Sequence, residues 1–278
     1  MSLVRDESGR LHIDTPLMAE SLMDKTLLDS TEADTVFRAM PNLNVIKLGG
    51  QSIIDRGGQV VLPLLDEIVA ARKEEEHELL VMTGGGTRSR HVYAVALDLG
   101  MPTGVLAKLG ASISEQNALM LSMLLAPHGG IKIGHDDVVK LPAYMALGSI
   151  PVMHAMPPYG LWEEPAALGR IPPHRTDSGV FLTAEVVGAR RCILVKDERG
   201  LFTADPKKDP TADFISEIEV GELLALDLAD LAVERAMLHA LARARSVREV
   251  FVINGRQPGN LTRTLAGENP GTRIYRQT

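Results

Sequence analysis

From residue 42 onward the chain alternates short apolar segments with amphipathic ones, and this alternation limits the folds open to it. Segments 44–48 (NVIKL) and 78–83 (ELLVMT) are short, mostly apolar and followed by glycine, which is typical of buried strands. The segment 59–76 between them has helical periodicity. Its apolar face comprises Val60, Val61, Leu64, Leu65, Ile68 and Val69. Strands that alternate with helices predict right-handed crossovers and a largely parallel sheet covered on both faces, a three-layer α/β/α sandwich.

The same pattern continues to the C-terminus and predicts one domain. Further strands are expected at 148–155, 191–197 and 247–255, with an edge strand at 271–275. Helices are expected at 89–100, 114–130, 178–189 and 259–268. In the second of these, Ser114 is placed to cap the helix and Gly129–Gly130 to end it. Because no internal repeat or low-complexity linker interrupts residues 42–278, we expect one domain in two lobes.

Residues 1–41 have a different character. Apolar residues recur there at helical spacing among acidic side chains, at Leu17, Met18, Leu22, Met23, Leu27 and Leu28. This spacing predicts a helical arm packed on the body or on a neighbouring subunit. The alternative is a frayed polar tail.

Composition narrows the function classes. The net charge is −7, so nucleic-acid binding has no general support, and an anionic ligand must be held by local donors. The single cysteine, Cys192, excludes an intrachain disulfide and a thiolate metal cluster, and it fits a cytoplasmic protein. No apolar stretch reaches the roughly 20 residues that a membrane-spanning helix needs.

Two glycine-rich junctions follow predicted strands. Lys47 lies inside the first strand and Gly49–Gly50 come directly after it. Gly84–Gly86 follow the second strand and precede a helix, where Arg88 and Arg90 are placed to clamp an oxyanion. Glycine lets backbone N–H groups approach phosphate oxygens closely, so both junctions are candidate anion sites. Each alone is also compatible with an ordinary tight turn.

Two later segments add polar candidates. Thr176 or Asp177 is placed to cap the helix that follows. In LVKDERGLFTADPKKDP, residues 194–210, Lys196 ends a buried strand and Gly200 permits a turn. Phe202 is placed to face a flat base, although an aromatic residue is more often part of the core. Asp205–Pro206 begins the next turn.

The remaining candidates are a loop and several histidines. Residues 155–175 are rich in proline and carry the single tryptophan, so we expect a functional or interface loop, with a plain surface excursion as the alternative. The histidines show no metal-ligand spacing. His135 and His154 are the weak metal candidates, because each lies near a predicted strand or loop edge.

Taken jointly and in this order, these segments resemble the amino-acid kinase superfamily, in its uridylate-kinase-like branch. The resemblance lies in KLGGQS, TGGGTRSRH, DLGMP, TDSGVF, LVKDERGLFTADPKKDP and NGRQPGNLTRTLAGENPGTRI, and it extends over residues 44–276. It implies the carbamate- or uridylate-kinase-like fold, with the nucleotide half in roughly residues 170–278.

Within that branch the chain resembles the molybdenum storage proteins, especially their beta-type chains. The segments concerned are VIKLGGQSIIDRGG, PLLDEIVAARK, GTRSRHVYA, GVLAKLGAS, QNALML, MPPYGLW, IPPHRTDSG and PGNLTRTLAGE. That family binds ATP with Mg²⁺ and deposits molybdate or tungstate as polyoxometalate clusters inside a closed hexamer. The resemblance implies ATP binding and hydrolysis in a homo- or hetero-oligomer, with or without an alpha-like subunit, and no nucleic-acid or membrane partner.

The resemblance also implies roles for individual residues. Lys47, Lys196 and Asp177 are the catalytic candidates: the lysines neutralise phosphate charge, and Asp177 positions Mg²⁺, a lysine or water. Residues expected to bind the nucleotide are Gly49, Gly50, Gly84, Gly85, Gly86, Arg88, Asp197, Gly200, Phe202, Asp205 and Pro206.

Departures from the uridylate kinase pattern fall on the acceptor side. Gln51 stands where those enzymes have glutamate, and residues 87–91 read TRSRH in place of Asn followed by Arg-Gly. The segment from Lys196 to Pro210 is better preserved. A uridylate kinase or related small-phosphate kinase is therefore the alternative function, and a subunit that binds nucleotide without turning it over is a third.

Overall fold

The computed structural model describes residues 3–5, 7–13, 17, 22–30, 36–73 and 77–277. The chain divides into two compact units, Met1–Phe37 and Arg38–Thr278. This division lies close to residue 41, where the sequence pattern changes.

The described residues of the N-terminal unit form two short strands and one short helix. These are β1 (Leu3–Arg5), β2 (Leu11–Ile13) and α1 (Lys25–Ser30), and the two strands pair in antiparallel fashion. Leu27 and Leu28 of the predicted helical face lie in α1, and only Leu27 is buried there. Leu22 and Met23 lie in the turn before α1, and Met18 lies outside the described residues.

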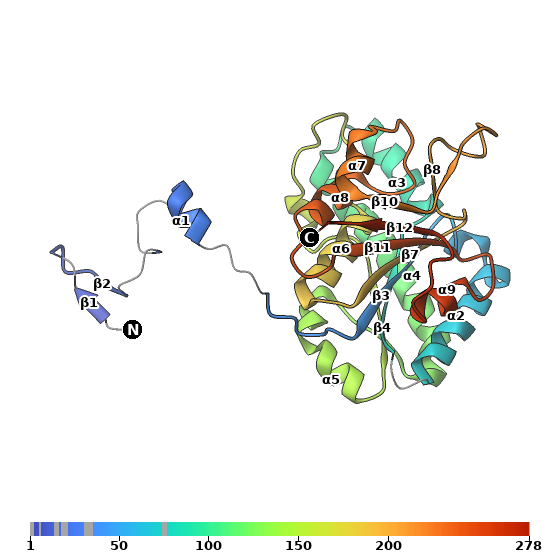
Figure 1. Ribbon diagram of the computed structural model, residues 1–278, viewed down its shortest axis with the longest axis horizontal. Coiled ribbons are helices and arrows are strands. Elements are labelled where there is room, and N and C mark those ends of the chain that lie inside the picture. The colour runs from blue at the N-terminus through green and yellow to red at the C-terminus, as the bar shows by residue number, and fades with distance from the viewer. Residues whose placement is uncertain are drawn as a thin grey trace. The chain divides into compact units, whose positions relative to one another are not determined.

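The unit from residue 38 onward is built on a mostly parallel sheet (Figure 1). In spatial order its strands are β10 (Glu217–Glu219), β12 (Thr272–Tyr275), β11 (Glu249–Asn254), β7 (Arg191–Lys196), β3 (Leu43–Leu48), β4 (Glu78–Thr83), β6 (Ile150–His154) and β5 (Gly130–Lys132). Only β11 and β12 pair antiparallel in this sheet. The predicted edge strand, β12, is second from the edge, because β10 pairs with its outer side.

Helices cover both faces of the sheet (Figure 1). One face packs against α2 (Gly58–Lys73), α9 (Asn260–Leu265) and the C-terminal part of α4 (Thr103–Leu125). The other packs against α5 (Leu141–Ala146), α6 (Thr176–Val187), α7 (Val220–Ala225) and α8 (Arg235–Ala242). Successive strand residues alternate between these cores: Val45 joins the α6 side and Ile46 the α2 side. The predicted three-layer α/β/α sandwich is confirmed.

Two parts of the fold differ from the sequence expectation. The helix predicted from Ser114 begins already at Thr103, so Ser114 lies inside α4 and caps nothing. Ser114 is buried, and its hydroxyl donates to the carbonyl of Thr83 at the end of β4. A small antiparallel pair, β8 (Leu201–Phe202) with β9 (Phe214–Ile215), was not expected. None of the described helices has the length and apolar character needed to cross a membrane.

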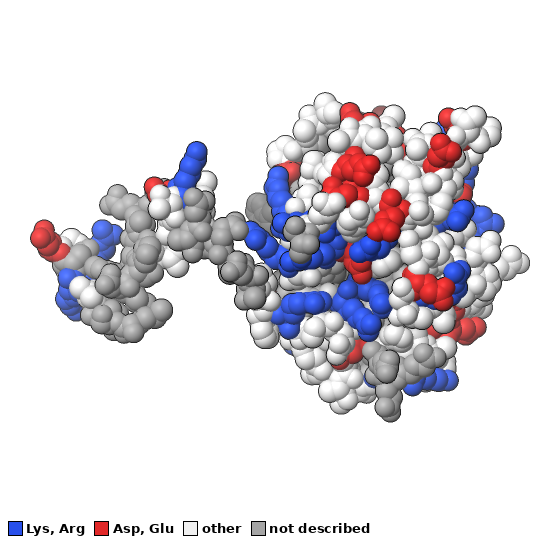
Figure 2. Space-filling model, viewed as in Figure 1, with Lys and Arg blue, Asp and Glu red and all other residues white. Residues whose placement is uncertain are grey.

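Charged side chains of both signs lie next to one another on the face of this unit seen in Figure 2. This mixture agrees with the modest net charge of −7 on the whole chain.

Candidate phosphate-binding site

The two glycine-rich turns lie side by side because the strands before them are neighbours. β3 and β4 run parallel in register, with Leu48 opposite Thr83, so their turns leave the sheet at the same edge. The Gly49 amide donates to the carbonyl of Val195 on β7 at 3.0 Å, and the Gly84 amide donates to Leu48 at 3.0 Å. These bonds seat both turns directly on the ends of three central strands.

Glycine is required where the turns meet. A Cβ atom on Gly50 would lie 2.1 Å from the Gly86 nitrogen, and one on Gly84 would lie 2.6 Å from the Gly50 nitrogen. Gly86 also has φ +76°, a conformation that L side chains rarely adopt. The close contact brings backbone amides from both turns toward one volume, which is the arrangement that binds phosphate.

Two polar side chains hold the turns in place. The Asp55 carboxylate accepts a 2.6 Å hydrogen bond from the Thr87 amide at the start of α3 (Thr87–Asp98). The Asn117 side chain, from α4, donates to the Gly84 carbonyl at 2.6 Å. Neither residue was singled out from the sequence, because their partners are 32 and 33 residues away along the chain.

The turns border a cavity of about 550 Å³, a size that suits a small-molecule ligand. Lys47, Arg90, Arg175, Lys196 and Asp197 are among its charged lining residues. Within the described residues, the amides of Gly50, Gln51, Ser52, Gly85 and Gly86 donate to no protein acceptor. These amides and the basic side chains make the cavity a place for an anion.

Two lysines meet one aspartate at this edge. Lys47 and Lys196 lie near the carboxyl ends of neighbouring strands, and both side chains point to the α6 side of the sheet. Lys47 donates to one carboxylate oxygen of Asp177, and Lys196 Nζ lies 3.0 Å from the other. Asp177 is only 3% exposed, so this is a buried triad that carries a net charge of +1 when all three groups are ionised.

Electrostatics keep the aspartate ionised. Burial raises the pKa of Asp177, but the charges and hydrogen bonds of Lys196 and Lys47 outweigh burial and hold that pKa well below its usual range. Burial lowers the pKa of Lys196, and the Asp177 carboxylate opposes this by raising it. Asp177 thus stabilises the ammonium form of a lysine that would otherwise lose its proton more readily.

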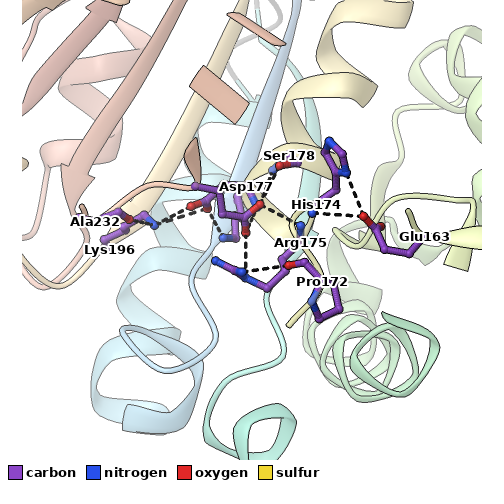
Figure 3. A network of polar contacts seen from close by, with 10 residues as sticks. Glu163, Pro172, His174, Arg175, Asp177, Ser178, Lys196 and Ala232 are labelled. Carbon is purple, nitrogen blue, oxygen red and sulfur yellow. Dashed lines mark hydrogen bonds and ion pairs between the residues drawn. The ribbon is translucent and has the colours of Figure 1, made fainter. Parts of the chain in front are cut away.

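The N-terminus of α6 is capped from elsewhere in the chain. Neither Thr176 nor Asp177 caps it, and the N-cap residue is Arg175, which provides no side-chain cap. The carboxylate of Glu234 accepts from the amides of Asp177 and Ser178 at 3.0 and 3.1 Å. Figure 3 shows this helix end, with Asp177 and Ser178 labelled beside Lys196.

Of the other residues predicted to bind the nucleotide, some line the cavity and some do not. Arg88 does not line the cavity: its guanidinium donates to Gln116 and Asn117 on α4. Asp197 does line it and is held by Arg56 at 2.6 Å and Lys207 at 3.2 Å. The remaining members of the nucleotide segment lie in or near β8 and the turn after it, outside the cavity lining: Gly200, Phe202, Asp205 and Pro206.

The predicted loop at residues 155–175 borders the same cavity. Met156, Ile171 and Arg175 line the cavity from this loop. Glu163 anchors the loop internally, because its buried carboxylate lies 2.9 Å from Nδ1 of His174 (Figure 3). The loop therefore closes one side of the cavity and is not a plain surface excursion.

The two histidine candidates lie together. His135 and His154 stack edge to face with ring centroids 4.4 Å apart, and His135 Nε2 lies 2.9 Å from the Met156 carbonyl. Nδ1 of His154 is buried without a hydrogen-bond partner among the described residues. Burial lowers the pKa of both imidazoles, to about 4 for His154, so both are neutral at pH 7.

Acid is expected to destabilise the protein through His154. Burial, with a smaller contribution from His135, lowers the pKa of His154 from 6.5 to about 4. The unfolded chain therefore takes up this proton at higher pH than the folded protein. The free energy of unfolding should fall as pH drops from about 6.5 to about 4, by up to about 3 kcal/mol from this group.

Urea unfolding at about pH 7 and about pH 4.5 measures this effect. His154→Asn should lose less stability between the two pH values than the wild type. His128→Asn, at an exposed histidine, should match the wild type. If His154→Asn loses as much stability as the wild type between the two pH values, His154 is not the group responsible.

The fold is that of an α/β protein with a largely parallel sheet, and the two glycine turns, two lysines and one aspartate at its carboxyl edge form a candidate anion site. The chain belongs to the amino acid kinase family, whose family model matches residues 42–254. Among solved structures, uridylate kinase from Archaeoglobus fulgidus has the same fold, with a TM-score of 0.66 and 23% identity over 83% of this chain and 99% of that one.

Two relatives are similar in sequence over most of the chain. It is 52% identical to the molybdenum storage protein subunit beta of Azotobacter vinelandii, over 93% of this chain and 95% of that protein. It is 28% identical to the uridylate kinase of Thermofilum pendens, over 81% of this chain and 94% of that enzyme. The resemblance seen in the sequence motifs is confirmed.

Proposed function

We propose that this chain is a subunit of a molybdenum storage protein, which uses ATP to deposit molybdate or tungstate as polyoxometalate clusters inside an oligomeric cage. The observation that carries the proposal is the 52% identity, which extends over nearly the full length of both chains. The relatives named uridylate kinase are 28% identical to this chain or less.

The cavity at the carboxyl edge is proposed to bind the ATP phosphates. Its glycine-turn amides approach the phosphate oxygens, and Lys47 and Lys196 neutralise charge on the γ-phosphoryl group. Asp177 is assigned to hold these lysines, since both of its carboxylate oxygens already face ammonium groups. We expect Mg²⁺ to arrive on the ATP phosphates with several of its waters.

His135 and His154 are proposed to contact the stored oxometalate. Neutral imidazole is a good nitrogen donor, and the partnerless Nδ1 of His154 suits this role. The described residues contain no group of three or more His, Cys, Asp or Glu side chains arranged to hold a metal ion. One chain thus offers few donors, and storage is proposed to need the inner surface of several subunits, in a hexamer with or without alpha-like chains.

The proposed setting is the cytoplasm, where a buried free thiol such as Cys192 stays reduced. Transfer of phosphate to UMP is the second candidate function, favoured by the shared fold and by relatives named uridylate kinase. The changed residues beside the glycine turns, among them Gln51, count against it.

Incubation with molybdate, Mg²⁺ and ATP should load the protein with many molybdenum atoms per chain, and omission of ATP should leave only background metal. Elemental analysis after gel filtration measures this, and the metal should elute with the oligomer. An alpha-like subunit is added in a parallel sample. Background metal in every sample, together with phosphorylation of UMP, would overturn storage in favour of the kinase.

A further inference from the structure

Two buried carboxylates with different partners lie at the first turn of α6, and Figure 3 labels one of them, Asp177. Asp177 belongs to the turn, and its carboxylate faces Lys47 and Lys196. Glu234 belongs to a distant segment just before α8, and its carboxylate faces the helix amides instead. Both side chains are buried, with exposed fractions of 3% and 7%.

Glu234 takes up the hydrogen-bond donors at this helix end. Its carboxylate accepts from the amides of Arg175, Asp177 and Ser178 at 2.9, 3.0 and 3.1 Å, and from the Ser178 hydroxyl at 2.7 Å. The first amides of a helix have no partner within the helix, and they carry its positive partial charge. One carboxylate therefore accepts hydrogen bonds from three of the backbone amides at this helix end.

This capping matters for Asp177, because the side chain of an aspartate in the first turn of a helix can itself hydrogen-bond to the helix amides. Aspartate side chains readily hydrogen-bond to backbone amides at a helix N-terminus, which is why they are common there. A side chain that turns back to cap its own helix cannot also lie between two lysines on the sheet. In this protein the amides are already occupied by Glu234, so that option is closed to Asp177.

We propose that Glu234 is a positioning residue, which caps α6 and thereby keeps the Asp177 carboxylate turned toward Lys47 and Lys196. Its segment also contacts Lys196 directly, since the Ala232 carbonyl accepts a hydrogen bond from the Lys196 ammonium group. Residues 232–234 thus connect the helix end and the lysine. The expected effect of Glu234 on ATP turnover rests on the proposed function. Its expected effect on Asp177 and the lysines does not.

Loss of the cap should be detectable at Lys196 itself. The pKa of Lys196 is lowered by burial and raised by Asp177, with smaller effects from Lys47 and Glu234. If the Asp177 carboxylate turns back to the helix, Lys196 stays buried but loses its nearest negative charge. Its pKa falls further, and more of its amine is neutral and nucleophilic near pH 8.

The test measures acylation of Lys196 by excess acetic anhydride at about pH 8, read by mass spectrometry of the Lys196 peptide. The side chain lines the cavity and is partly exposed, so the reagent can reach it. Glu234→Gln should accelerate this modification about 10-fold, which corresponds to a pKa lower by about one unit. No ATP or molybdate is present, so the result is independent of the proposed function.

Glu185→Gln is the matched control. Glu185 also lies on α6, and its carboxylate accepts from the amides of Arg245, Ser246 and Val247 at 2.7, 2.9 and 2.7 Å. It contacts neither lysine of the site, so its loss should lower stability without changing Lys196 acylation by more than about 2-fold. An equal acceleration in both variants would mean general loosening and would overturn the proposal.

The Asp177→Asn background tests whether Glu234 acts through Asp177. There, Glu234→Gln should add little further acceleration, because the group that it positions no longer carries charge. If the two substitutions accelerate Lys196 acylation in a fully additive way, the proposal is overturned. If Glu234→Gln does not fold, Glu234→Asp keeps the charge on a shorter side chain and should give a smaller acceleration. An unchanged rate in that folded variant would overturn it as well.

If ATP turnover is also established, Glu234→Gln should lower kcat more than it raises KM for ATP. Both lysines still line the cavity for binding, while their alignment for catalysis is lost. A rise in KM with kcat unchanged would contradict a positioning role. Failure of ATP turnover in the wild type would count against the proposed function alone.

Discussion

Lys47→Ala is expected to reduce ATP hydrolysis about 100- to 1,000-fold, the range typical of removing one charge-stabilising donor from a transition state. Lys47 ends in the cavity beside both glycine turns and belongs to the buried triad with Asp177 and Lys196. Without Lys47 the triad changes from a net charge of +1 to neutral, so the site loses the positive charge that attracts phosphate. The measurement is phosphate release at saturating ATP and Mg²⁺.

Two further variants separate charge from packing. Lys47→Met keeps most of the side-chain length and removes the ammonium group, so it should show nearly the same loss with a smaller change in stability. Lys73→Ala, at an exposed lysine at the end of α2, should retain wild-type turnover. ATP-dependent metal loading should fall along with hydrolysis. Normal hydrolysis and loading in Lys47→Ala would remove the phosphate assignment.

Local patterns predicted most of the sheet and the helices next to it. The strands at β3, β4 and β7 are short, apolar and followed by glycine or charge, and burial on both faces enforces that pattern. Lys47 stood out because it lies inside such a run, and Lys196 because it ends one. That both lysines point to the same face follows from strand periodicity and from the parallel register of β3 with β7.

The partners of these elements could not be predicted in the same way. Glu234 and Asp177 are 57 residues apart, and Asp55 and Thr87 are 32 apart, so no local spacing connects them. Ser114 illustrates the same limit: serine before an apolar run is typical of a cap, but its hydroxyl contacts Thr83 across the layers. In each case a tertiary hydrogen bond overrides the local preference of the residue.

Very short strands could not be predicted from the sequence either. β5 and β10 have three residues each, too few for alternation to identify a strand. They form because a neighbouring strand offers unpaired hydrogen-bonding groups along its edge. Position in the sheet, not intrinsic preference, therefore decides their structure, and for this reason β12 was expected at the edge and lies inside it.

Gly50→Ala is expected to have the second large effect, because the two glycine turns touch at this residue. The added methyl would lie 2.1 Å from the Gly86 nitrogen and 2.6 Å from its Cα, both backbone atoms that cannot rotate away. The turns must separate, so the free energy of unfolding should fall by about 3 kcal/mol and ATP should bind about 100-fold more weakly.

Gly58→Ala is the matched control for this change. Gly58 is eight positions further on and begins α2, where a new Cβ would meet only the end of the Leu62 side chain at an ordinary 3.5 Å. Alanine also favours a helix over glycine, so this variant should unfold at equal or higher urea concentration and bind ATP normally. Urea unfolding and calorimetric titration with ATP compare the two. If Gly50→Ala binds ATP as tightly as Gly58→Ala, the phosphates do not lie between the turns and the cavity must bind its anion through its basic side chains instead.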